Sequence, residues 1–237
     1  MREQVVILAA GRGTRLGRPH PKPLTPMHDG RTIHGHQLDH LAAVLPGAQV
    51  YVVVGFKLEM ILEAHPEQVF VYNEAYDETN TSKSLLRGLR ATNEGGVLWM
   101  NGDVVFERAV LDRAAPMIAS EQSFVAVNTA SVGDEEVKYT VDADGWIRDL
   151  SKTAQSALGE AVGLNFVSAA DKAALIARLD DVDDQDYFER GIELAIERNG
   201  LRFAALDISD LSAVEVDTPE DLARANQSLR DRTGLLR

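Results

Sequence analysis

Residues 5–17 read Val-Val-Ile-Leu-Ala-Ala-Gly-Arg-Gly-Thr-Arg-Leu-Gly, and this stretch decides the fold. The apolar run at residues 5–9 is typical of a strand that is buried on both faces. The glycine-rich turn that follows lets backbone N–H groups approach phosphate oxygens closely. The stretch therefore predicts the first strand of an α/β sheet with a phosphate-binding turn. A tight strand-to-helix connection would use the same residues, so the turn alone leaves that alternative open.

Strand-like runs and helical patterns alternate along the first half of the chain. The runs span residues 49–54, 69–72, 97–101 and 124–128, and the helical patterns span residues 33–45, 58–64, 82–91 and 108–119. Alternation at this spacing predicts an α/β fold with a Rossmann-like, mostly parallel sheet and helices on both faces.

The second half predicts a small antiparallel elaboration of that sheet. Residues 138–141 and 146–150 flank a turn-rich tetrad at residues 142–145, which is typical of a hairpin. We expect further strands at residues 162–167, 202–206 and 213–216, and helices at residues 169–179, 186–198 and 218–230.

Composition excludes several classes of function. The chain has 237 residues, no cysteine and a formal net charge of −13. Without cysteine there are no disulfides, thiolate metal sites or cysteine nucleophiles. An acidic surface disfavours nucleic acid and anionic membranes, because proteins bind both by neutralising phosphates with Lys and Arg. No apolar run approaches the ~20 residues of a membrane span, and no signal segment is evident, so we expect a cytoplasmic protein.

Positive charge nevertheless gathers around the glycine-rich loop, at Arg12, Arg15, Arg18 and Lys22. Lys22 stands between two prolines, which restrict the backbone and limit the entropy lost on binding. An arginine and a lysine that converge on a triphosphate neutralise the charge that builds on a leaving pyrophosphate. We predict Arg15 and Lys22 as the catalytic cations; the other two arginines also suit solvated positions.

The loop differs from two common nucleotide-binding loops. No Gly-Lys-Ser/Thr follows it, as a Walker A loop requires. Leu16 occupies the third glycine position of the dinucleotide fingerprint, which disfavours an NAD-dependent oxidoreductase.

The order Leu8-Ala9-Ala10-Gly11-x-Gly13-Thr14-Arg15-Leu16, followed by Pro21-Lys22-Pro23-Leu24, resembles the opening of the nucleotidyltransferases that make nucleotide sugars and CDP-alcohols. In that superfamily the loop wraps the triphosphate, and the matching Arg and Lys assist the transfer. The resemblance implies a single nucleotidyltransferase domain over residues 1–237, with a nucleotide-binding part in about residues 1–130 and an acceptor-binding part in about residues 131–237. It also implies that the nucleotide contacts Leu8, Ala9, Ala10, Gly11, Gly13 and Thr14.

Two aspartates each end a predicted strand. Asp103 lies at the carboxyl end of its strand, where open α/β sheets bind ligands, and Asp217 ends a short run in the second half. Carboxylates are ligands that Mg²⁺ prefers beside substrate phosphates, and in the superfamily the matching aspartates hold the catalytic metal. We predict that Asp103 and Asp217 bind Mg²⁺, that Asp103 also contacts the nucleotide, and that Glu215 is a second choice of ligand. Both aspartates also suit a helix cap or turn.

The segment Asn80-Thr81-Ser82-Lys83-Ser84-Leu85 resembles the Asn-x-x-x-Ser-Leu segment of phosphocholine, aminoethylphosphonate and inositol-phosphate cytidylyltransferases. In those enzymes it lies near the base and ribose, which implies nucleotide contacts from Asn80 and Ser84. Gly55, after an apolar run, fits a further backbone position against the nucleotide. Polar groups at a helix start also commonly cap it. Lys83 departs from the aromatic or apolar residue expected there.

Two further segments point to the acceptor. Residues 159–163 resemble the Gly-Glu-x-x-Gly segment of the cytidylyltransferase acceptor pocket, and Lys152 resembles a lysine that contacts acceptor phosphate. Acidic and aromatic side chains at residues 186–189 suit a cationic amine or choline head group. We predict an acceptor site formed by Lys152, Glu160, Asp186, Tyr187 and Glu189. An acidic run is also typical of a solvated loop, and an aromatic residue of a helix anchor.

The sequence thus predicts a Mg²⁺-dependent nucleotidyltransferase. It would transfer CMP from CTP to a small phosphorylated acceptor, such as a phospho-alcohol or phosphonate, and release pyrophosphate. The alternatives are a sugar-1-phosphate nucleotidyltransferase that uses UTP, GTP or dTTP, and a non-catalytic nucleotide-binding module. The expected partners are the nucleoside triphosphate and the acceptor, without nucleic acid or membrane; a homodimer is left open.

Overall fold

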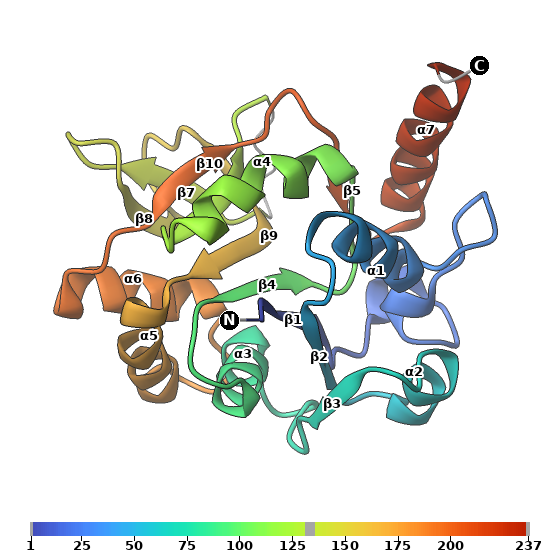
Figure 1. Ribbon diagram of the computed structural model, residues 1–237, viewed down its shortest axis with the longest axis horizontal. Coiled ribbons are helices and arrows are strands. Elements are labelled where there is room, and N and C mark those ends of the chain that lie inside the picture. Colours follow the sequence, from blue (N-terminus) through green and yellow to red (C-terminus); the bar gives the residue numbers. More distant parts are fainter. Residues whose placement is uncertain (1, 131–135, 236–237) are drawn as a thin grey trace.

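The computed structural model describes residues 2–130 and 136–235 as a central sheet covered by helices (Figure 1). The strands are β1 (Gln4–Ala9), β2 (Gln49–Val54), β3 (Val69–Tyr72), β4 (Val97–Asn101), β5 (Val104–Phe106), β6 (Phe124–Asn128), β7 (Lys138–Val141), β8 (Ile147–Ser151), β9 (Gly159–Val167), β10 (Ala204–Asp207) and β11 (Ala213–Glu215). The α-helices are α1 (Ile33–Val44), α2 (Leu58–Ala64), α3 (Thr81–Ala91), α4 (Arg108–Ala119), α5 (Ala169–Asp181), α6 (Phe188–Asn199) and α7 (Pro219–Leu235). Two short 3₁₀ turns, η1 (Thr14–Leu16) and η2 (Lys22–Leu24), lie in the glycine-rich loop region.

The main sheet has the strand order β10-β6-β9-β4-β1-β2-β3. Strands β4, β1, β2 and β3 pair in parallel, β10 is parallel to β6, and β9 runs antiparallel between β4 and β6. The hairpin of β7 and β8 attaches to β9 through β7. This arrangement confirms the predicted α/β fold with a mostly parallel sheet and a small antiparallel elaboration.

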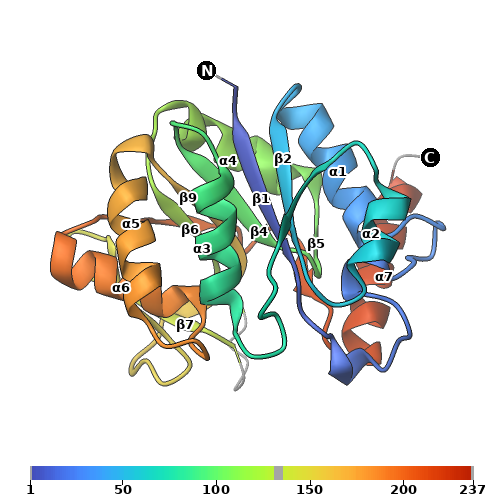
Figure 2. The ribbon, with the colours of Figure 1, turned by 90° about the horizontal axis from the view of Figure 1, so that it is seen from below.

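The apolar run of β1 is continuous because both of its faces are covered. Val6 and Leu8 pack in the core beneath α3, α5 and α6, whereas Val5 and Ile7 pack in the core beneath α1 and α4. Successive side chains of a strand point to opposite faces, so a strand between two helical layers needs an apolar residue at every position. Figure 1 shows the two helical layers, and Figure 2 looks onto the face that α3 and α5 cover.

The second half follows the predicted pattern with shifted bounds, and the first half contains one unforeseen strand. The hairpin turn closes where the tetrad predicts, since the amide of Asp142 donates to the carbonyl oxygen of Trp146 at 2.8 Å. Strand β9 begins at Gly159, earlier than the expected start at residue 162. The sequence pattern missed β5, which is only three residues long and pairs antiparallel with β11 as a separate two-stranded sheet. That small sheet positions the candidate site.

Among the described helices, none combines the length and the apolarity that crossing a bilayer would require.

Candidate active site

The candidate site lies where the neighbouring strands β1 and β4 end. These strands are parallel and in register, with Leu8 beside Asn101. The amide of Gly102 donates to the carbonyl oxygen of Leu8 at 2.8 Å. The glycine-rich loop that leaves β1 and the turn that leaves β4 therefore meet at one edge of the sheet, which is where open α/β sheets bind ligands.

The two predicted metal ligands meet at this edge, although they are far apart in sequence. Pairing of β5 with β11 brings the segment before Asp217 against the turn that carries Asp103, and the amide of Val216 donates to the carbonyl oxygen of Asp103 at 3.0 Å. One carboxylate oxygen from each of Asp103, Glu215 and Asp217 lies within 4.8 Å of the other two. The second-choice ligand thus joins the predicted pair.

Both predicted catalytic cations reach this carboxylate cluster. The ammonium of Lys22 donates to Oδ2 of Asp103 at 2.9 Å and also to Oδ1 of Asp217. The guanidinium Nη2 of Arg15 lies 2.6 Å from Oδ2 of Asp217. The Lys22 side chain is only 13% exposed, whereas that of Arg15 is 64% exposed. Lys22 is therefore a mostly buried residue of the site, and Arg15 lies at the solvent-exposed edge of the site.

The clustered side chains shift the pKa values of Glu215 and Lys22. Burial raises the pKa of Glu215 well above its usual value, and the carboxylates of Asp103 and Asp217 raise it further. Burial by itself would lower the pKa of Lys22, but the same two carboxylates outweigh that effect and raise it. The cluster places oxygen atoms of three carboxyl groups beside one lysine and one exposed arginine, and this donor set fits a divalent cation that prefers oxygen ligands.

Gly13 makes room for the lysine. Its φ of +58° is in the left-handed region, and a Cβ there would lie 2.6 Å from Cγ of Lys22. A side chain at this position would be strained and would displace the lysine stem. Gly13 and Lys22 line a small pocket together with Leu8, Ala9, Gly11, Pro23 and Asp103. The side chain of Thr14, another predicted contact, lies outside the described part of the chain.

A second pocket adjoins the first along the start of α3. It is lined by Leu8, Ala10, Gly11, Tyr76, Thr79, Asn80, Thr81, Ser84, Asn101, Asp103 and Glu215. The predicted nucleotide residues from the loop and from α3 thus face a common space. Asn80 also caps α3, as the alternative interpretation expects, because its side-chain oxygen accepts from the amide of Thr81 at 2.8 Å.

Gly55 lies behind the wall of this pocket. A Cβ at Gly55 would come within 2.5 Å of Cβ of Tyr76 and 2.8 Å of the carbonyl oxygen of Ala10. Glycine is therefore needed for the close approach of Tyr76, which the sequence analysis overlooked and which lines the pocket. A direct contact between Gly55 and the nucleotide stays a prediction.

The predicted acceptor residues fall into separate groups. Glu160 lines a third pocket with Glu136 and Glu215, and Glu215 also lines the second pocket, so these two pockets adjoin. The ammonium of Lys152 lies 5.0 Å from the ring centroid of Tyr187, and the Tyr187 side chain is exposed. The structure thus brings Glu160 to the carboxylate cluster and Lys152 to Tyr187.

The other two predicted acceptor residues are Asp186, which has a contact within its loop, and Glu189, which is buried in α6. The carboxylate of Asp186 accepts from the amide of Asp183 at 3.0 Å within its own loop. Glu189 is buried, and burial raises its pKa to about 7. Contact of these two residues with an acceptor stays a prediction.

Gln37 is a residue of the site that the sequence analysis missed. Its side-chain amide donates to the carbonyl oxygens of Asn101 and Val104, both at 2.9 Å, and so clamps the turn that carries Asp103. The side chain is buried in α1. A glutamine on the buried face of a helix needs a hydrogen-bond partner, but the sequence does not reveal which strand supplies it.

Known proteins are similar to this chain in sequence and in fold. The model of the MobA-like NTP transferase domain matches residues 5–180. A CMP-5'-(3-aminopropyl)phosphonate synthase from Streptomyces rubellomurinus is 34% identical over 245 residues, which cover 94% of this chain and 38% of that protein. The chain therefore spans less than half the length of that relative.

Two solved structures have the same fold over nearly their whole length. The CTP:phosphocholine cytidylyltransferase from Streptococcus pneumoniae has a TM-score of 0.75 at 19% identity, with 97% of this chain and 100% of that chain covered. The inositol-1-phosphate CTP transferase from T. maritima has a TM-score of 0.79 at 17% identity, with 97% and 95% covered. These similarities agree with the resemblance seen in the sequence motifs. Because the family model extends from β1 into α5, the chain belongs to the MobA-like NTP transferase domain family.

Proposed function

We propose that this protein is a Mg²⁺-dependent nucleotidyltransferase that transfers CMP from CTP to a small phosphorylated acceptor. The observation that carries the proposal is the meeting of Arg15 and Lys22 with Asp103 and Asp217 at the end of the glycine-rich loop. Cations that face a loop of backbone N–H groups suit a polyphosphate, and clustered carboxylates suit the metal that accompanies it. A non-catalytic binding module would not need both sets together.

The proposed reaction is a direct in-line displacement. An oxygen of the acceptor phosphate or phosphonate forms a bond to the α-phosphorus of CTP, and the bond from that phosphorus to the bridging oxygen breaks, releasing pyrophosphate. Lys22 and Arg15 stabilise the negative charge that develops on the phosphoryl group and the leaving group. Asp103 and Asp217 would hold Mg²⁺, which when bound neutralises charge on phosphate oxygens.

Two features support cytidine and a cationic acceptor. The relative from Streptomyces rubellomurinus is named for a CMP-linked aminopropylphosphonate, and the two solved structures are titled as CTP-dependent transferases. The pocket beside the carboxylate cluster is lined by Glu136, Glu160 and Glu215 and by one arginine, Arg224, and the excess of acidic side chains would attract an amine. We propose an amino-bearing phosphonate or phospho-alcohol as the acceptor. A nucleoside triphosphate substrate also suits the cytoplasmic location that we propose.

The test is pyrophosphate release by the purified protein with each of CTP, UTP, GTP, ATP and dTTP in Mg²⁺. The acceptor panel contains 3-aminopropylphosphonate, phosphocholine, inositol 1-phosphate and glucose 1-phosphate. We expect release with CTP and an amino-bearing acceptor, and none with excess EDTA. Turnover of UTP or dTTP with the sugar phosphate would instead assign the sugar-1-phosphate alternative. Nucleotide binding without pyrophosphate release from any pair would identify a binding module.

A further inference from the structure

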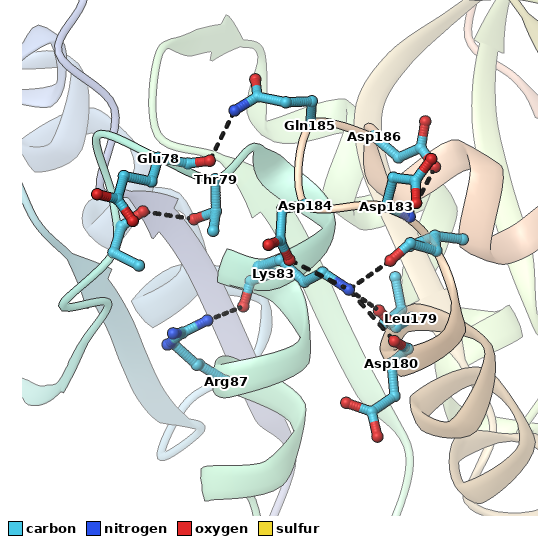
Figure 3. Close-up of polar contacts among 12 residues, drawn as sticks. Glu78, Thr79, Lys83, Arg87, Leu179, Asp180, Asp183, Asp184, Gln185 and Asp186 are labelled. Atoms are coloured by element: carbon cyan, nitrogen blue, oxygen red, sulfur yellow. Dashed lines mark hydrogen bonds and ion pairs between the residues drawn. The ribbon is translucent and has the colours of Figure 1, made fainter.

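Lys83 is a buried lysine that links two helices. It belongs to the first turn of α3, and its side chain is 10% exposed. Its ammonium donates to the carbonyl oxygens of Leu179 at 3.1 Å, Asp180 at 3.3 Å and Val182 at 2.6 Å, at the end of α5 (Figure 3). The last carbonyls of a helix have no partner within it, so Lys83 satisfies groups that would otherwise need solvent.

This position is unfavourable for a lysine in terms of α3 alone. The first turn of a helix carries partial positive charge, and a cation there is destabilising. Burial of an ammonium adds a desolvation cost unless hydrogen bonds compensate for it. The compensation comes from α5, whose final turn carries partial negative charge. A lysine at this position is therefore explained by its hydrogen bonds to the end of α5 and not by any stabilisation of α3.

The segment held in this way continues into a loop at residues 183–187, which is also bonded to the start of α3. The amide of Asn80 donates to the carbonyl oxygen of Asp184 at 2.7 Å, and the amide of Ser82 donates to that of Asp186 at 3.3 Å. Gln185 adds a hydrogen bond on the solvent-exposed side, where its side-chain amide donates to the carbonyl oxygen of Glu78 at 2.6 Å (Figure 3). The loop and the start of α3 therefore form one hydrogen-bonded unit.

The two sides of this unit face different predicted ligands. Asn80 and Ser84 line the pocket assigned to the nucleotide. The loop ends in Asp186 and Tyr187, and the ring of Tyr187 is in contact with Lys152. We propose that Lys83 is a positioning residue that sets the 183–187 loop, and so the acceptor, relative to the bound nucleotide. This inference rests on the proposed function of the site. In-line transfer depends on that placement, because small displacements of a reacting group cost large factors in rate.

The experiment compares Lys83→Met with Arg90→Met. Methionine is of similar length to lysine and lacks the ammonium. Arg90 also links α3 to α5, through Asp180 at 3.0 Å, but it is exposed and does not touch the loop. For Lys83→Met we expect the KM for the acceptor to rise about tenfold or more, with a change in the KM for CTP of less than about threefold. Arg90→Met should leave both values unchanged. A role confined to docking the two helices would lower the free energy of unfolding of Lys83→Met without a selective rise in the KM for the acceptor.

Three outcomes decide the inference. The inference is overturned if Lys83→Met folds and its KM for the acceptor equals that of the wild-type protein. It is also overturned if the KM values for the acceptor and for CTP rise equally. If Lys83→Met does not fold, Gln185→Ala takes its place. Gln185 is exposed, so its replacement should not disturb the core, and loss of its hydrogen bond loosens the same loop with Lys83 intact. That variant must raise the acceptor KM in the same direction, and an unchanged value overturns the inference.

A separate readout distinguishes failure of the inference from failure of the proposed function. If the wild-type protein releases no pyrophosphate from any substrate pair, the proposed function fails. Hydrogen exchange then tests the structural half alone: amides at residues 183–188 should exchange faster in Lys83→Met than in Arg90→Met. Equal exchange in the two variants contradicts the inference whether or not the protein is active.

Discussion

The ammonium nitrogen of Lys22 lies 2.9 Å from Oδ2 of Asp103, although 81 positions separate the two residues in the chain. The same ammonium contacts Asp217, so one positive charge is shared between the two carboxylates that we propose as metal ligands. Lys22 and the proposed divalent cation would thus compete for one set of oxygens. Arrival of a triphosphate would give Lys22 other anionic partners and leave the carboxylates to the metal.

Replacement of Lys22 should strengthen metal binding while it weakens catalysis. In Lys22→Met we expect Mn²⁺ to bind several-fold more tightly than in the wild-type protein when nucleotide is absent. Pyrophosphate release should fall by about 10²–10³-fold, because a cation at the transferring phosphoryl group is lost. Calorimetric titration with Mn²⁺ and the pyrophosphate assay measure the two effects. Arg18→Met removes one exposed charge from the same loop and should change neither, whereas weaker Mn²⁺ binding in Lys22→Met would contradict the competition.

Loss of either aspartate should have the opposite effect on the metal. Asp103→Asn and Asp217→Asn each remove one carboxylate from the cluster, so Mn²⁺ affinity and transfer activity should both fall, the activity by at least about 10²-fold. Asp210→Asn is a suitable control, since Asp210 pairs with Arg113 on an exposed surface. Full activity in either of the first two variants would remove that residue from the proposed metal site.

Gln37 offers a test of how the turn that carries Asp103 is held. Gln37→Leu removes this donor from one buried and one partly buried carbonyl oxygen, and a buried group left unsatisfied costs about 1–3 kcal/mol. Urea unfolding should show that loss, and turnover should also fall because Asp103 is less firmly placed. The matched variant is Gln227→Leu on the exposed side of α7, for which we expect little change in either quantity. Reduced stability with full turnover would mean that the clamp serves the fold alone.

Replacement of Glu189 by glutamine should raise the free energy of unfolding at high pH but not at low pH. Burial raises the pKa of Glu189 from 4.5 to about 7, so the folded state keeps a proton that the unfolded chain releases. Stability from this group is therefore present at low pH and is lost as the pH rises from 4.5 to about 7. Glu189→Gln should match the wild-type protein near pH 4.5 and exceed it at pH 8 by on the order of 3 kcal/mol in the free energy of unfolding.

His34 acts in the opposite direction over nearly the same interval, so the effect of Glu189 must be measured as a difference between proteins. Burial, with a contribution from His65, lowers the pKa of His34 from 6.5 to about 4, and stability from this group is lost as the pH falls through that range. Urea unfolding of wild-type, Glu189→Gln and Glu197→Gln at both pH values gives the comparison. Glu197 is exposed on the same helix and should show no such difference. An equal stability of the first two proteins at pH 8 would show that burial does not raise the pKa of Glu189.

Local sequence determined the elements of the sheet and the phosphate-binding loop. Apolar runs with no polar alternation predicted strands between two helical layers, and Val5 and Val6 do point into opposite cores. The glycines and prolines around Lys22 predicted the loop, because they restrict or permit backbone angles whatever the rest of the chain does. Such signals act over a few residues, so they are legible without the fold. The predicted site residues await experiment.

Only the tertiary structure decided which side chains meet. The three residues of β5 are too few to show a period, yet their pairing with β11 brings Asp217 to Asp103. The roles of Gln37 and Lys83 depend on carbonyl oxygens that distant segments supply. Burial of Glu189 likewise depends on what packs over α6. Contacts of this kind arise from strand order and from the direction of side chains in space, and neither is encoded in the residues beside them.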